Sequence, residues 1–224
     1  GIHCKVRAIR AVNASTLRLF GGTSCGMTYD LYIALAVFAF VTSITPGPNN
    51  IMLMTSGVNF GFYRTIPHML GVGIGFVVMV LGVGSGLAGM FQSWPVAHDI
   101  LKIVSTVYLL WLAWRIATQP VRRIEAGSAA RPMTFLEAAA FQWVNPKAWA
   151  MALTAVTAYS PDRELATILL VAIVFGAINL PAVGSWTLLG EAMSGILRKP
   201  ARLRAFNITM AVLLVASLWP LVMA

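Results

Sequence analysis

Apolar stretches of about 20 residues recur along the 224-residue chain and are separated by short polar connections. A helix of about 20 apolar residues is long enough to cross the roughly 30 Å of hydrocarbon in a bilayer. The connections leave no room for a soluble domain, so we expect an all-α integral membrane protein. The pattern predicts six membrane-spanning helices, at 31–53, 69–91, 100–118, 135–158, 165–189 and 205–223.

Two of these stretches are interrupted at a similar depth by adjacent proline and asparagine residues. A proline lacks an N–H, and its ring clashes with the carbonyl four residues earlier, so carbonyls are released from the helical ladder. In hydrocarbon such polar backbone persists only where it is buried in protein or lines a cavity. The breaks therefore indicate a place where a solute binds. The first stretch contains Thr45-Pro46-Gly47-Pro48-Asn49-Asn50, and the fourth contains Asn145-Pro146-Lys147.

The two interrupted stretches open two halves of three spans each, residues 27–118 and 135–224. A polar, turn-prone linker at 119–134 joins the halves. With three spans per half, the second half is inverted relative to the first. Corresponding broken helices in inverted halves mark a substrate site near the middle of the membrane in secondary transporters. We therefore predict a single domain of six transmembrane helices in two inverted three-helix halves, with helices 1 and 4 interrupted.

Glycines are frequent in the second stretch, where several lie four residues apart. Small residues with this spacing allow membrane helices to approach closely. The pairs Gly71/Gly75 and Gly82/Gly86 are therefore predicted to be helix-packing positions.

Polar side chains near the breaks are the candidate substrate-binding groups. Lys147 lies near the middle of the fourth stretch, where a charged side chain usually faces a bundle interior or an aqueous cavity. It can hold a substrate carboxylate, or it can be a structural lysine tied to the freed carbonyls. Asn179 accompanies Pro181 in the fifth stretch and indicates either a third break or an interhelical hydrogen bond. The candidate substrate-binding residues are Pro46, Gly47, Pro48, Asn49, Asn50, Asn145, Pro146, Lys147 and Asn179.

Composition and charge agree with a membrane protein, since 58% of the residues are hydrophobic and only 10% are charged. The net charge of +9 does not indicate nucleic-acid binding, because the basic residues gather in the first, third and fifth connections. Cytoplasmic loops carry this excess of Lys and Arg, which predicts that both termini face outward. The oligomeric state stays open, with a homodimer as one alternative.

Residues 1–26 do not follow this charge distribution and lack the apolar core of a signal peptide. We expect Met27 to be the natural start and 1–26 to be a non-native or misassigned extension. An amphipathic or targeting segment is the alternative. Both cysteines, Cys4 and Cys25, lie in this segment, so no disulfide is expected in the transmembrane part.

The chain lacks the groups that an intramembrane enzyme would need. No histidine lies deep in a predicted span, and Asp30, Glu137 and Glu191 approach spans only at their ends. We therefore expect no catalytic residues, no metal site and no cofactor.

Three motifs together resemble those of the LysE/RhtB family of amino-acid exporters. They are the sequence from Thr45 to Asn50, Gly61-Phe-Tyr-Arg64 followed by Gly71 and Gly75, and Asn145-Pro-Lys147. The resemblance covers about residues 28–224, and the stretch from Tyr108 to Thr118 is most similar to the cysteine/O-acetylserine branch. The Pro67-His68 pair departs from the family pattern.

The resemblance implies a bacterial inner-membrane exporter of amino acids that works by proton antiport. It implies that Pro46, Gly47, Pro48, Asn49, Asn145, Pro146 and Lys147 are motif residues. The absence of an intramembrane carboxylate favours small neutral substrates, such as cysteine, O-acetylserine, threonine or homoserine. The alternative is a membrane sensor or interaction protein that binds a small ligand in the same cavity without moving it.

A zwitterionic amino acid needs donors for its carboxylate and acceptors for its ammonium. Lys147 and the asparagine amides are the expected donors, and the carbonyls released by the prolines are the expected acceptors. We expect the two halves to rock about this site and so give alternating access. Proton coupling is assigned to Lys147, with Glu137 or His68 as alternatives.

Overall fold

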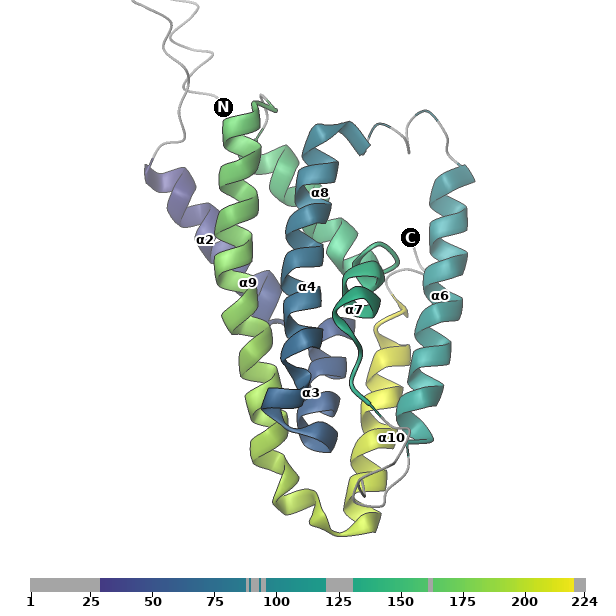
Figure 1. Cartoon of the computed structure of the whole chain (residues 1–224). Coiled ribbons are helices and arrows are strands. Elements are labelled where there is room, and N and C mark those ends of the chain that lie inside the picture. Colours follow the sequence, from purple (N-terminus) through teal and green to yellow (C-terminus); the bar gives the residue numbers. More distant parts are fainter. Residues whose placement is uncertain are drawn as a thin grey trace, which may run out of the picture.

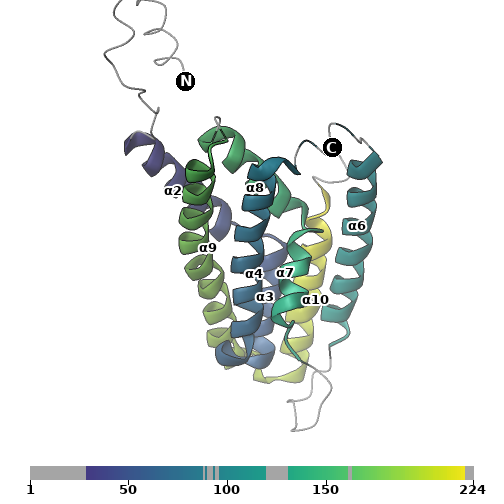
Figure 2. The ribbon, with the colours of Figure 1, turned by 45° about the horizontal axis from the view of Figure 1, so that its top comes forward.

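The computed structural model describes residues 29–87, 89, 93, 96–119, 131–160 and 163–219. All regular structure within these ranges is helical, and the helices form one bundle (Figures 1 and 2). The expectations for residues 1–26 and for most of the linker at 119–134 lie outside the described residues.

Both predicted interruptions are present. The first stretch forms α2 (Tyr29–Ile44) and α3 (Pro48–Phe60), which are bent by 54° at the break. The fourth stretch forms α7 (Phe135–Gln142) and α8 (Pro146–Tyr159). Pro48 and Pro146 occupy the beginnings of the helices that resume, where the missing N–H costs no hydrogen bond.

The remaining helices are continuous. Pro181 lies inside α9 without ending it, so the alternative of a third break is wrong. These helices are α4 (Phe62–Gly82) with the π-helical turn η1 (Val83–Leu87), α6 (Val96–Ala117), α9 (Leu165–Ser194), the 3₁₀ turn η2 (Ile196–Arg198) and α10 (Pro200–Ala216).

Three segments of the described chain are long and apolar enough to cross a membrane: Phe62–Leu87, Asp99–Ala117 and Leu165–Ser194. The bent pair of α2 and α3 makes a fourth if it is counted as one span. The helices α7, α8 and α10 have 8, 14 and 17 residues, so none reaches this length alone. The arrangement of six spans in two inverted halves therefore stays a prediction.

The outer surface of the bundle is apolar. Val37 of α2, Ile103 of α6, Ile173 of α9 and Val212 of α10 are each more than half exposed. Such contiguous apolar exposure is typical of a surface that faces another apolar phase. The C-terminal ends of α3, α6 and α9 lie at one end of the bundle, the lower one in Figure 1.

Glycines bring two pairs of helices into backbone contact. A Cβ atom at Gly57 of α3 would collide with the carbonyl of Thr187 in α9, and one at Gly190 with the carbonyl of Met54. Helix α3 therefore lies directly against α9.

The predicted packing glycines of α4 have different outcomes. A Cβ at Gly71 would collide with the carbonyl of Phe135, and one at Gly75 would lie 2.7 Å from the Cα of Ala139, so both face α7. A Cβ at Gly82 would lie 2.7 Å from the side chain of Leu87 and 3.4 Å from that of Trp143, so Gly82 packs against side chains. The prediction for Gly86 is wrong. Gly86 adopts φ +111° in the π-helical turn, and a Cβ there would meet no atom within 4 Å.

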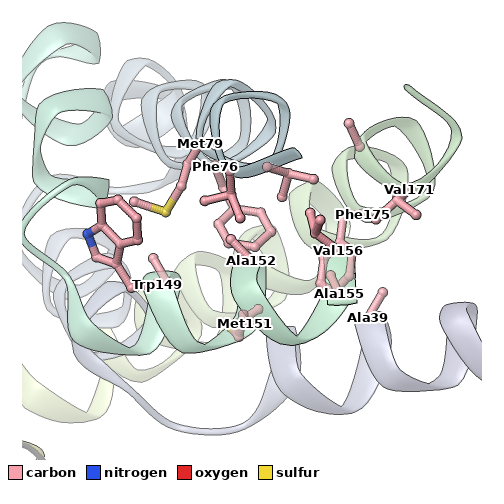
Figure 3. Close-up of a cluster of buried hydrophobic side chains, with 14 of the residues drawn as sticks. Ala39, Phe76, Met79, Trp149, Met151, Ala152, Ala155, Val156, Val171 and Phe175 are labelled. Atoms are coloured by element: carbon pink, nitrogen blue, oxygen red, sulfur yellow. The ribbon is translucent and has the colours of Figure 1, made fainter. Parts of the chain in front are cut away.

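A buried hydrophobic cluster positions the resumed helix α8 (Figure 3). Phe175 of α9 lies against Phe76 of α4, with ring centroids 5.3 Å apart. Three alanines of α8, at positions 148, 152 and 155, are at most 2% exposed and pack into the same cluster. Helix α8 is thereby held beside α4 and α9, with its first residues at the break.

Substituting Gly190 with alanine tests the contact between α3 and α9. We expect Gly190→Ala to destabilise the protein by about 1–3 kcal/mol, because the added methyl group must displace backbone. Gly195→Ala is the matched control, since a Cβ there has open space and its φ is −63°. Thermal unfolding of the purified full chain in detergent measures both. Equal unfolding midpoints for the two variants would contradict the close contact.

Candidate functional site

The carbonyls at the end of α2 accept hydrogen bonds from side chains of other helices. The Nδ2 of Asn50 donates to the carbonyls of Ser43 and Thr45, both at 2.8 Å. The indole Nε1 of Trp186, from α9, donates to the carbonyl of Ile44 at 3.1 Å. Asn50 is only 3% exposed, so its amide closes the end of α2 inside the protein.

Lys147 joins the two breaks. Its Nζ donates to the carbonyl of Thr45 at 2.6 Å and lies 3.4 Å from the carbonyl of Pro46. The side chain is half-buried, and its stem passes over Gly47. A Cβ at Gly47 would lie 2.7 Å from Cδ of the lysine. Because Gly47 has an extended backbone that any residue adopts (φ −174°), glycine is needed here for space.

A reciprocal amide pair also links the breaks. Asn49 Nδ2 donates to Gln142 Oε1 at 2.8 Å, and Gln142 Nε2 donates to Asn49 Oδ1 at 3.2 Å. The Nε2 of Gln142 also donates to the carbonyl of Ala138 at 2.9 Å. Gln142 has no exposed surface, so the beginning of α3 is fixed to the end of α7 by buried hydrogen bonds.

The second break satisfies its own backbone. The Oδ1 of Asn145 accepts from the backbone N–H of Lys147 at 3.1 Å and so caps α8. The backbone N–H of Asn145 donates to the carbonyl of Gln142 at 3.2 Å. The expectation that Pro146 leaves this carbonyl free for a substrate is therefore wrong in this conformation. The carbonyl of Ile44, released by Pro48, is likewise taken by Trp186.

Asn179 forms an interhelical hydrogen bond, which was one of the two alternatives predicted for it. Its Nδ2 donates to Ser43 Oγ of α2 at 3.1 Å, and the residue is 5% exposed. Its Oδ1 is buried and has no hydrogen-bond partner among the described residues. This oxygen is therefore an unused acceptor.

A small cavity of about 20 Å³ lies between the two breaks. This volume holds about one water molecule, not an amino acid. Of the nine candidate residues, Pro46, Pro48 and Pro146 do not line it, and the other six do. Lys147 is the only lining residue with a charged side chain. The lining residues are Thr42, Ser43, Gly47, Asn49, Asn50, Phe76, Asn145, Lys147, Ala148, Met151, Asn179 and Val183.

Three residues whose side chains hydrogen-bond to other helices at the breaks were not among the candidates: Ser43, Gln142 and Trp186. Gln142 stands four residues before Pro146, at the end of an apolar stretch, and this position was an available signal. Trp186 carries no such signal, because its sequence surroundings are those of an ordinary membrane helix. Its contact with Ile44 spans 142 positions of the chain.

Comparison with known proteins places the chain among membrane translocators. Residues 40–217 match the family described as LysE type translocator. The chain is similar to the cysteine/O-acetylserine efflux proteins of Escherichia coli (strain K12) and Shigella sonnei (strain Ss046). Each is 31% identical over 194 residues, which cover 84% of this chain and 96% of the relative. That of Escherichia coli O157:H7 is 30% identical over the same coverage. No solved structure is significantly similar.

A double-mutant cycle tests whether Gly47 is required for the position of Lys147. We expect Gly47→Ala to destabilise the protein by about 1 kcal/mol, because its Cβ pushes the ammonium from the Thr45 carbonyl. In the Lys147→Ala background the same substitution should cost nothing, since the stem that it meets is absent. Thermal unfolding of the four proteins gives the coupling energy. Additive costs would show that Gly47 acts independently of the lysine.

Proposed function

The chain belongs to the LysE type translocator family, and from this premise we propose that it exports small neutral amino acids or close derivatives. The names of its relatives favour cysteine and O-acetylserine as substrates. Membership of a translocator family confirms the prediction of a transporter rather than an enzyme. The proposed location is the bacterial inner membrane, with both termini outward.

The observation that carries the proposal is the contact of Lys147 with the opposite break. Its ammonium lies in the small cavity between the breaks and is bound to the carbonyl of Thr45. A substrate carboxylate is a stronger acceptor than a carbonyl, because it carries a full negative charge. In the proposed mechanism the carboxylate replaces Thr45 as the partner of Lys147.

The substrate ammonium needs an acceptor, and Asn179 supplies one. Its buried Oδ1 has no partner among the described residues and lines the cavity with Lys147. The carbonyls of Ile44 and Gln142 already accept hydrogen bonds within the protein. We therefore assign the role of ammonium acceptor to this oxygen of Asn179 instead. No lining residue of the cavity is acidic, so a substrate with a cationic side chain would find no counter-ion. This composition favours a neutral zwitterion.

Transport requires the cavity to enlarge, since its volume of about 20 Å³ has room for only about one water molecule. We propose that two inverted halves of three spans rearrange about the breaks and open the cavity to either side in turn. The ammonium of Lys147 would leave the Thr45 carbonyl in this step. A proton is the proposed coupling ion.

Efflux from intact cells tests the function. Cells that express the full chain are loaded with dipeptides, and cysteine, O-acetylserine, threonine, homoserine, leucine and lysine are followed outside. We expect selective efflux of neutral amino acids, reduced tenfold or more by Lys147→Ala. Lys199→Ala is the matched control, because this lysine is exposed and does not line the cavity. Efflux by Lys147→Ala at the normal rate would exclude Lys147 as a substrate-binding residue. Amino-acid binding by the native chain without efflux would indicate a sensor.

Proton antiport predicts a definite sign for the pH dependence. Acidifying the outside from pH 8 to pH 6 enlarges the inward proton gradient, so efflux should become faster. If Lys147 carries the proton, residual efflux by Lys147→Ala should not change between these pH values. Proteoliposomes that contain the purified chain separate this effect from metabolism. The same pH dependence in the variant and in the native chain would reassign the proton to another group.

A further inference from the structure

A second and larger cavity lies toward the end of the bundle where α3 and α6 end. Its volume is about 320 Å³, within the range of small-molecule sites. It is bounded by α3, α4, α6 and residues 131–133, and it shares no lining residue with the cavity at the breaks. None of the nine candidate substrate-binding residues lines it.

His68 is the buried polar group of this cavity. The residue is 2% exposed, and neither ring nitrogen has a hydrogen-bond partner in the part of the chain that the structure describes. A neutral imidazole has one donor and one acceptor nitrogen. Leaving both nitrogens unpaired in the interior costs free energy, so a ligand that forms hydrogen bonds with them would be favoured in this cavity. The occupant that suits it both donates and accepts hydrogen bonds.

Arg115 supplies the positive charge of the cavity. Its guanidinium lies over the ring of Trp111, with the central carbon 4.9 Å from the ring centroid, and it forms no ion pair within the described residues. Arg131 also lines the cavity, but it is bound to both carboxylate oxygens of Glu137 at 2.7 and 2.8 Å. These hydrogen bonds raise the pKa of the Arg131 guanidinium. The charge left for a ligand is therefore that of Arg115.

Hydroxyl oxygens on α3 supply acceptors. Thr65 Oγ1 donates to the carbonyl of Gly61 at 2.8 Å, so the 2.8 Å contact with Ser56 is donated by the serine. Thr55 Oγ1 donates to the carbonyl of Ile51 at 2.8 Å. Both hydroxyl protons are thus used, and the lone pairs of Ser56 and Thr55 remain able to accept from an ammonium group.

We propose that this cavity is an entry site that binds the zwitterionic head of an amino acid. Arg115 binds the carboxylate, and the oxygens of Thr55 and Ser56 accept hydrogen bonds from the ammonium. His68 forms a further hydrogen bond with the same zwitterionic head. A lipid phosphate would use the donors and leave these acceptors unused. The inference rests on the exporter function proposed above.

The route onward follows α3. Asn49 lines the cavity at the breaks, and Thr55 lines the entry site six residues later in the same helix. At 1.5 Å per residue, the two sites lie about 9 Å apart along α3. The entry site and the cavity at the breaks therefore lie one after the other along α3.

Equilibrium binding tests the entry site separately from transport. The purified full chain is placed in nanodiscs of phosphatidylcholine, and binding of radiolabelled L-cysteine is measured under reducing conditions. We expect Lys147→Ala to retain one site per chain. Adding Arg115→Gln should weaken that site about tenfold or more, because a charge-assisted hydrogen bond is lost. Arg204→Gln, an exposed arginine that does not line the cavity, is the matched control.

Two analogues identify the group that Arg115 binds. In the Lys147→Ala background, Arg115→Gln should weaken 3-mercaptopropionate, which keeps the carboxylate, and leave cysteamine, which keeps only the ammonium, unchanged. His68→Phe keeps a flat aromatic ring and removes both nitrogens, so it should weaken cysteine binding without lowering the unfolding midpoint. Displacement of cysteine by added phosphatidylglycerol would overturn the proposal in favour of a lipid headgroup.

Efflux distinguishes failure of the entry site from failure of the exporter. Arg115→Gln should raise the internal cysteine concentration for half-maximal efflux about tenfold and keep the maximal rate. Efflux by the native chain together with no cysteine bound to Lys147→Ala would refute the entry site and leave the exporter intact. No efflux by the native chain would refute the exporter itself.

Discussion

Backbone carbonyls released inside an apolar bundle must find donors, and this requirement organises the structure around the end of α2. The carbonyls of Ser43, Ile44, Thr45 and Pro46 follow one another there without a continuing helix. Their donors come from three different helices: Asn50 from α3, Lys147 from α8 and Trp186 from α9. The break is thus an attachment point for those helices rather than a defect in one of them. Each unsatisfied group would cost several kcal/mol in hydrocarbon.

This requirement unites the two interpretations of Lys147. As a structural residue it satisfies Thr45, and as a binding residue it would release Thr45 to take a carboxylate. The carbonyl of Thr45 therefore takes the position on Lys147 that a substrate carboxylate would occupy. A substrate gains affinity only by the difference between the two acceptors, which favours a charged carboxylate over a neutral polar group.

The prolines made both helix breaks predictable, because the lack of an N–H is a local property of Pro48 and Pro146. Six of the nine candidate side chains also line one cavity. Partners that depend on folding could not be predicted in this way. Gln142 pairs with Asn49 across 93 positions of the chain, and Pro181 is accommodated inside α9 although local reasoning allows a break there. The spacing of the second glycine pair was misleading for Gly86, because this residue lies in a π-helical turn that changes the helical register.

The glycine contacts have a mechanical consequence. At Gly57 and Gly190, and again at Gly71, backbone lies against backbone, so the α3–α9 and α4–α7 contacts must separate rather than slide when the two proposed halves rearrange. Between α4 and α9 the contacts of Gly73, Gly176 and Gly184 are instead with the side chains of Leu180, Val77 and Met69. Side chains change rotamer on a fast timescale, whereas backbone does not. The contact between α4 and α9 is therefore one that side-chain rearrangement alone can loosen.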